Sequence, residues 1–114
     1  MTETINLSRL YAVMQHKSAR QRIVLFLFAA GYSGDQIQRM TVKDLLAVNM
    51  PDDLNVYRAE VIEDLANSGN SAPAFVYPNG NLLVEADFRR LLRETTKRCF
   101  GKPLTQKQFR EKIR

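Results

Sequence analysis

The chain holds few of the residues that build disulfide frameworks or metal sites. Its 114 residues include one cysteine, Cys99, one histidine, His16, and no tryptophan. A lone cysteine excludes a disulfide within the chain, and one cysteine with one histidine is too small a ligand set for zinc. We therefore expect neither a metal nor another cofactor.

Long apolar runs are missing as well. No stretch reaches the roughly 18 uncharged apolar residues that a membrane-spanning helix needs. The N-terminus, with Glu3 near its start, lacks the basic and then apolar segments of a signal peptide. Hydrophobic residues make up 45% of the chain and charged residues 25%, the balance of a soluble globular protein. The composition therefore predicts a cytoplasmic protein without membrane contact.

Acidic residues are scarce in the C-terminal part of the chain. From Gly80 onward there are ten basic residues against four acidic ones, a net charge of +6, whereas the first 79 residues carry seven basic and eight acidic residues. Such an asymmetry indicates a polyanionic partner for the C-terminal half. A solvated, arginine-rich helix surface is the alternative, and charge alone does not separate the two.

The longest apolar segment predicts a buried helix. Six apolar residues, IVLFLF, occupy positions 23–28, so they face every side of a helix and need neighbours all round. Ser18 is a suitable N-cap for a helix over 19–30, and Gly31 has no Cβ to oppose the left-handed conformation that often ends a helix. We expect this central helix to form the middle of the core.

The rest of the chain also reads as helical. Two short helices should follow the Gly31 corner, one capped by Ser33 and one opened by the capping-box spacing of Thr41 and Asp44. Apolar spacing and start signals predict four more helices, from residue 7 for about three turns, over 52–67 with an acidic outer face, over 85–100, and from 105 to the end. The prediction is a mainly α, single domain over residues 1–114, with residues 1–6 frayed.

One segment has two structural interpretations. Residues 74–84 are predicted to hold at most one short strand or hairpin, because Asn79-Gly80 favours a tight turn between strands. The other interpretation is a single extended piece followed by a turn into the next helix.

Three basic residues share one side of the helix predicted over 85–100. Arg89, Arg93 and Lys97 are spaced four residues apart, which places them in one stripe along the helix. A cationic stripe of this kind can follow a phosphate backbone.

Two segments resemble a known family. The segment AAGYSGDQIQRMTVKDL (29–45) is similar to the tyrosine recombinase, or phage integrase, pattern Thr-Gly-Leu-Arg-Ile-Ser-Glu-Leu-Leu-Ala-Leu-X-X-X-Asp-Ile. Its matching positions are Gly31, Ile37, Met40, Val42, Asp44 and Leu45. The segment LTQKQFREKIR (104–114) resembles the family's Leu-Thr-X-His-X-Leu-Arg-His, with Phe109 at the leucine. The resemblance implies a reduced helical catalytic core, and it favours one extended piece over a hairpin at 74–84.

The resemblance also indicates which chemistry is missing. The family attacks a DNA phosphate with a tyrosine, while two arginines hold the phosphate oxygens. By this resemblance Arg110 stands at the second arginine and Lys107 at a histidine or lysine, but Ser33 replaces the first arginine and Gln36 the following glutamate. None of the four tyrosines lies beyond Arg110. We therefore expect no enzymatic activity and no small-molecule substrate, and we treat Ser33, Lys107 and Arg110 as vestigial positions.

These observations predict a function in DNA binding. We expect a catalytically inactive, integrase-like protein that grips duplex DNA and serves a mobile element or plasmid as regulator or architectural factor. The expected phosphate contacts come from eight basic residues: Arg89, Arg93, Lys97, Lys102, Lys107, Arg110, Lys112 and Arg114.

Two alternatives stay open. The first is a protein interaction module that binds an active recombinase or self-associates, because the family exchanges C-terminal helices between subunits and a chain that ends before that region would leave an apolar groove. The second is a fragment of a longer recombinase, although truncation would not explain the serine at position 33. Steep salt dependence of DNA binding would favour the DNA hypothesis over the interaction module.

Overall fold

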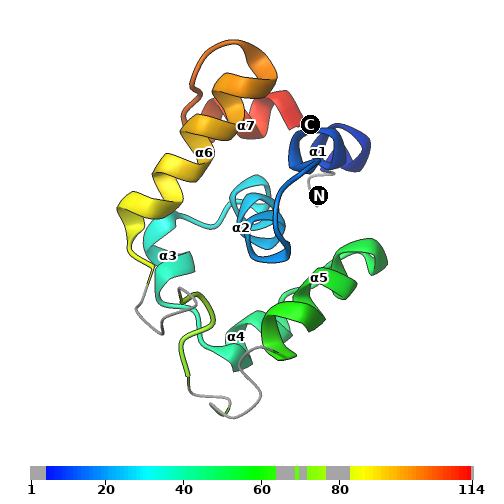
Figure 1. The fold of residues 1–114 in the computed structure, drawn as a ribbon, viewed down its shortest axis with the longest axis vertical. Coiled ribbons are helices and arrows are strands. Elements are labelled where there is room, and N and C mark those ends of the chain that lie inside the picture. The colour runs from blue at the N-terminus through cyan, green and yellow to red at the C-terminus, as the bar shows by residue number, and fades with distance from the viewer. Residues whose placement is uncertain (1–4, 64–68, 70–71, 77–82, 114) are drawn as a thin grey trace.

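Helix α2 (Ala19–Ala30) runs through the middle of the protein, with the other helices arranged around it (Figure 1). The computed structural model describes residues 5–63, 69, 72–76 and 83–113. Every residue from Ile23 to Ala29 is buried, because α2 packs against five other helices, α1, α3, α5, α6 and α7. The apolar residues on all sides of α2 are thus covered, as predicted from the sequence.

The ends of α2 are fixed by local hydrogen bonds. The Ser18 hydroxyl accepts a hydrogen bond from the Gln21 backbone N–H, and the Gln21 side chain accepts one from the Ser18 N–H. At the other end Gly31 has a φ of 106°, in the left-handed region that favours glycine. The chain leaves the helix at this corner and turns into α3 (Gly34–Gln38).

Helices α1 (Leu7–Met14) and α5 (Asp52–Glu63) pack on α2. Asn6 caps α1 through its side chain, and the Asn6 N–H donates a hydrogen bond of 3.0 Å to the Ile113 carbonyl. Ile5 packs against the core, so residues 5 and 6 are ordered, contrary to the expectation that the whole of 1–6 is frayed. On α5, Leu54 and Val61 are buried, and the part of the predicted helix beyond Glu63 lies outside the described residues.

Helix α4 (Val42–Ala47) begins at the predicted capping box. The Thr41 N–H donates to the Asp44 carboxylate at 3.1 Å, and the Asp44 N–H donates to the Thr41 hydroxyl at 3.2 Å. Thr41 also forms an isolated antiparallel bridge with Pro73, and the Leu83 N–H donates to the Phe75 carbonyl. The described part of 74–84 forms no extended sheet, and residues 77–82, which include the Asn-Gly turn, lie outside the described residues.

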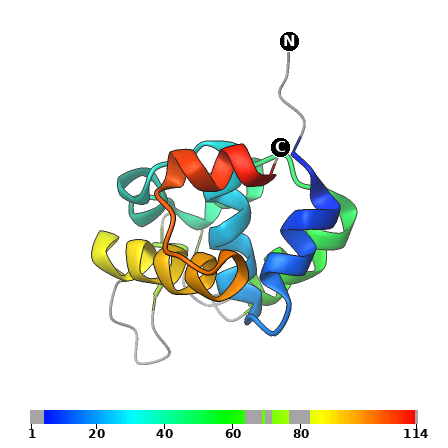
Figure 2. The same cartoon turned by 90° about the horizontal axis from the view of Figure 1, so that it is seen from above.

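Helices α6 (Glu85–Phe100) and α7 (Gln106–Ile113) complete the fold, and Figure 2 shows α2 between them. Phe88 of α6 contacts Phe75 edge to face, with ring centroids 6.0 Å apart. Gly101, with a φ of 82°, ends α6. The mainly helical fold class is therefore confirmed, and no helix among the described residues is long and apolar enough to cross a membrane.

A buried threonine fixes the turn between α6 and α7. The Thr96 hydroxyl donates to the Leu92 carbonyl at 2.8 Å and accepts from the Leu104 N–H at 2.9 Å. Both Thr96 and Leu104 are almost fully buried. The sequence analysis did not identify Thr96, because its role depends on a residue eight positions away.

Replacing Thr96 with valine is expected to lower the free energy of unfolding by about 1–3 kcal/mol, because the buried Leu104 N–H loses its acceptor. Urea unfolding followed by circular dichroism measures the effect. The matched control is Thr95→Val, since the Thr95 hydroxyl is buried without a hydrogen bond in the part of the chain that the structure describes. Equal losses in the two variants would show that the hydrogen bond to Leu104 contributes nothing specific.

Candidate nucleic-acid interface

The predicted basic stripe lies on the exposed side of α6. The buried side of this helix holds Phe88, Leu92, Thr95 and Thr96, whereas Arg89, Arg93 and Lys97 are exposed. Asp87 fixes the start of α6 by accepting a hydrogen bond from the Val84 N–H. The three cations therefore stand on one rigid helix.

The cations of this stripe differ in their neighbours. Arg89 forms an ion pair with Glu85, one turn earlier on α6. Arg93 and Lys97 form no ion pair within the described residues, and both are exposed. An ion pair on the surface contributes little to stability and is screened by salt. Arg89 can therefore exchange Glu85 for another anion with little loss of free energy.

The remaining predicted contacts are distributed over the turn and α7. Lys102 is exposed in the turn after α6, and Lys107 and Lys112 are exposed on α7. Arg110 is half-buried and lies against the Gly31 corner, where a Cβ built on Gly31 would sit 3.5 Å from the guanidinium carbon. Arg114 lies outside the described residues.

Arg110 and Ser33 thus border the same corner of the fold. Gly31, which touches Arg110, is two residues before Ser33, so the two segments that resemble the recombinase pattern meet here. Ser33 and Gln36 form a capping box for α3. The Gln36 N–H donates to the Ser33 hydroxyl at 3.1 Å, and the Ser33 N–H donates to the Gln36 side chain at 2.8 Å. Ser33 and Gln36 are therefore engaged in helix capping.

A residue that the sequence analysis missed ties α7 to this corner. The Gln106 amide donates hydrogen bonds to the carbonyls of Phe28, at 3.2 Å, and Tyr32, at 2.8 Å. The Phe28 carbonyl also accepts from the Gly31 N–H, and Tyr32 follows the end of α2, so the Gln106 amide joins α7 to the corner after α2. Local spacing does not indicate this contact, because Gln106 stands 74 residues after Tyr32.

A groove of about 890 Å³ separates α6 from the start of α7. Its lining includes the apolar residues Phe28, Leu92, Pro103 and Leu104, with Arg89 and Arg93 on the α6 wall, and Ser33, Thr105 and Gln106 around them. Gly34 allows α3 to approach α6 closely, because a Cβ there would come within 2.9 Å of the Glu85 Cγ. The groove therefore combines an apolar lining with two guanidinium groups and the Glu85 carboxylate, which forms an ion pair with Arg89.

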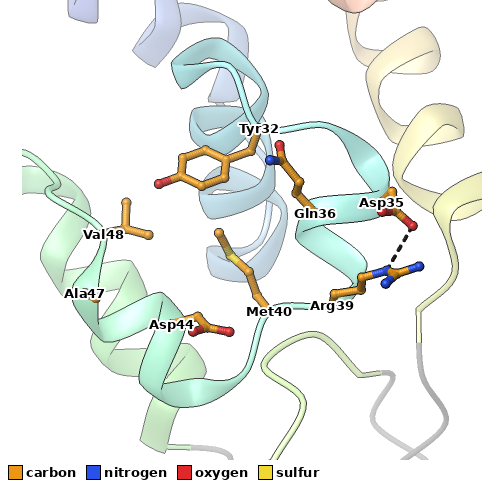
Figure 3. A pocket seen from close by; sticks show the side chains of 8 residues that line it. All are labelled: Tyr32, Asp35, Gln36, Arg39, Met40, Asp44, Ala47 and Val48. Atoms are coloured by element: carbon orange, nitrogen blue, oxygen red, sulfur yellow. Dashed lines mark hydrogen bonds and ion pairs between the residues drawn. The ribbon is translucent and has the colours of Figure 1, made fainter.

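A second hollow, of about 420 Å³, lies on the other side of α3 (Figure 3). Tyr32, Met40 and Val48 line its apolar part, and Asp35 and Arg39 form an ion pair at its edge. No group of three histidine, cysteine, aspartate or glutamate residues within the described ranges can hold a metal ion. The two carboxylates that line this hollow have partners, since Asp35 pairs with Arg39 and Asp44 belongs to the capping box of α4.

Asp44, at the rim of this hollow, titrates below its ordinary range. The hydrogen bond from the Thr41 N–H and that with the Thr41 hydroxyl lower the pKa of the Asp44 carboxyl, and Lys43 adds a smaller effect of the same sign. A carboxylate with a lowered pKa in the folded state stabilises the protein above the unfolded pKa of about 4, and this contribution is lost as the pH falls through the lowered value.

We expect Asp44→Asn to reduce the acid sensitivity of the protein. The amide keeps an acceptor for the Thr41 N–H but has no charge, so the variant is less stable than the native chain at neutral pH, and the difference shrinks below pH of about 4. Thermal unfolding at a series of pH values from neutral to about 2.5 measures this. A constant difference between the two proteins over that range would exclude Asp44 as a source of acid sensitivity.

Comparison of the chain with known proteins found no match among protein-family models, curated proteins or solved structures.

Proposed function

We propose that this protein binds duplex DNA through the basic surface of α6 and α7 and does not cut it. The observation that carries the proposal is the exposed stripe of Arg89, Arg93 and Lys97 along one rigid helix, followed by exposed Lys102 and Lys107. Cations on a fixed helix bind phosphates with less loss of conformational freedom than cations on a loose tail.

The dimensions of the stripe suit a DNA strand. Eight residues of α-helix separate Arg89 from Lys97, a rise of about 12 Å. One DNA strand presents a phosphate about every 3.4 Å along the helix axis, so the stripe spans roughly three to four phosphate spacings. Arg93 and Lys97, which make no ion pair within the described residues, need not break one to bind.

The proposal of an integrase-like protein without catalysis has its own support. Arg110 lies against the Gly31 corner, where the resemblance brings its two segments together. The hydroxyl of Ser33 and the amide of Gln36 are used by the α3 capping box, and neither supplies the positive charge that a pentacoordinate phosphate needs. A regulator or architectural factor of a mobile element or plasmid is the role that we propose.

The test is binding to a labelled duplex of random sequence, followed by fluorescence anisotropy at increasing salt. Several phosphate contacts would lower the association constant roughly 10²- to 10³-fold between about 50 and 200 mM salt. Absence of binding at about 50 mM salt would contradict the proposal, because non-specific DNA binding is strongest at low salt.

The groove between α6 and α7 favours a second function, the binding of another protein chain. DNA phosphates gain no favourable interaction from the apolar surface of Phe28, Leu92 and Leu104. An apolar lining with charged walls is typical of sites that accept an amphipathic helix.

A further inference from the structure

We infer that the groove between α6 and α7 accepts the acidic face of α5 from a second copy of this chain. The inference does not depend on DNA binding, because it rests on the shape and charge of the groove and of the outer face of α5. The groove supplies the first of them, with an apolar floor that includes Phe28 and Leu92. Its α6 wall carries two guanidinium groups, those of Arg89 and Arg93, and one carboxylate, Glu85, so this wall has a net positive charge.

The outer face of α5 supplies the second surface. Four carboxylates are exposed along this helix, those of Asp52, Asp53, Glu60 and Glu63. Val56 lies among them with 60% of its surface exposed, and Ala59 is exposed beside it in helical spacing. The face therefore presents a small apolar centre with acidic residues around it, which is the chemical complement of the groove.

The one basic residue of α5 is turned away from this face. The Arg58 guanidinium donates hydrogen bonds to the Val48 carbonyl, at 2.6 Å, and to the Leu45 carbonyl, at 3.2 Å, at the end of α4. It also donates to the Asn55 side chain. Arg58 thus satisfies the last carbonyls of α4 and leaves the acidic face of α5 without a cation of its own.

The two surfaces lie on opposite sides of the molecule. In Figure 1 helix α6 is on one side of α2 and α5 on the other, and Figure 2 shows the same separation. One neighbour therefore cannot fill the groove of a molecule and cover its α5 at the same time. The contact is heterologous, and repeated contacts give an open head-to-tail chain rather than a closed dimer.

Self-association and DNA would compete for the same cations. A carboxylate of α5 in the groove occupies Arg89 or Arg93, which are also two members of the proposed phosphate stripe. The association is electrostatic in part, so it should be weak and strongest at low salt.

The experiment compares the native chain with two charge-reversed variants by sedimentation velocity at low and high salt. The groove variant is Arg89→Glu with Arg93→Glu, and the acidic-face variant is Asp53→Lys with Glu60→Lys. All four positions are exposed, so both variants should fold, which circular dichroism checks. The native chain is expected to form concentration-dependent oligomers at low salt, and each variant alone is expected to associate at least about tenfold more weakly.

Mixing the two variants gives the decisive result. The groove variant keeps a native acidic face, and the acidic-face variant keeps a native groove, so an equimolar mixture has one native contact and should form a 1:1 dimer that grows no further. A third variant, Arg9→Glu with Lys43→Glu, makes the same change of net charge as the groove variant, at exposed positions outside both surfaces, and should associate like the native chain. Native protein that stays monomeric at low salt, undiminished association in either variant, or a mixture without dimers would each overturn the inference.

Discussion

Phe26→Ala is expected to lower the free energy of unfolding by roughly 3–5 kcal/mol, the range typical of removing a buried phenylalanine ring. Phe26 is only 4% exposed and lies in the middle of α2, the helix against which five others pack. Domains of this size are stable by about 5–15 kcal/mol, so the loss is a large part of the total. The substitution therefore tests the arrangement of the whole core around α2.

Chemical denaturation of the native chain and the variant measures this difference. The matched control is Val56→Ala, which also removes apolar side-chain atoms but from a position that is 60% exposed on α5. We expect the control to change the free energy of unfolding by no more than about 0.5 kcal/mol. A loss below about 1 kcal/mol for Phe26→Ala would mean that α2 is not the centre of the core.

Neutralising the basic stripe is expected to have the largest effect on DNA binding. The triple variant Arg89→Ala, Arg93→Ala and Lys97→Ala removes three proposed phosphate contacts. Each contact contributes about 0.9 to the slope of log association constant against log salt, so the slope should fall by nearly three. At about 0.1 M salt the loss corresponds to a roughly 10²- to 10³-fold weaker association constant. The anisotropy titration with the random-sequence duplex measures both quantities.

A matched variant distinguishes the effect of the stripe on DNA binding from the effect of the protein's net charge. Arg9→Ala, Arg39→Ala and Lys43→Ala also remove three exposed cations, but these lie on or beside α1, α3 and α4. For this control variant, the slope of log association constant against log salt should remain within about one unit of the native value. Similar losses in the two triple variants would assign DNA binding to net charge and would contradict an interface on α6.

The sequence predicted the parts of the fold that depend on neighbours along the chain. The bounds of α2 and α6 agree with the predicted ranges 19–30 and 85–100, because each helix starts and ends at a local signal. The capping box of Thr41 and Asp44 also forms as predicted, since the two partners stand three residues apart. The exposed stripe of α6 follows in the same way from helical periodicity.

The candidate site depends on contacts that local patterns do not encode. Gln106 donates to the Phe28 carbonyl of α2, and Arg110 lies against Gly31, with nearly eighty residues of chain between the members of each pair. The fold determines both contacts, and no spacing in the sequence indicates them. The groove likewise arises only when α6, α7 and the corner after α2 come together.

The hydrogen bond from Asn6 to Ile113 has a consequence for the order of folding. It joins positions near the two ends of the described chain, and α1 also packs against α6 and α7. A loop of this length is costly to close, so contacts of high sequence separation form late. During synthesis α1 emerges before α6 and α7, the helices against which it packs. The apolar residues on that side of α1 therefore stay exposed to solvent until α6 and α7 have been made.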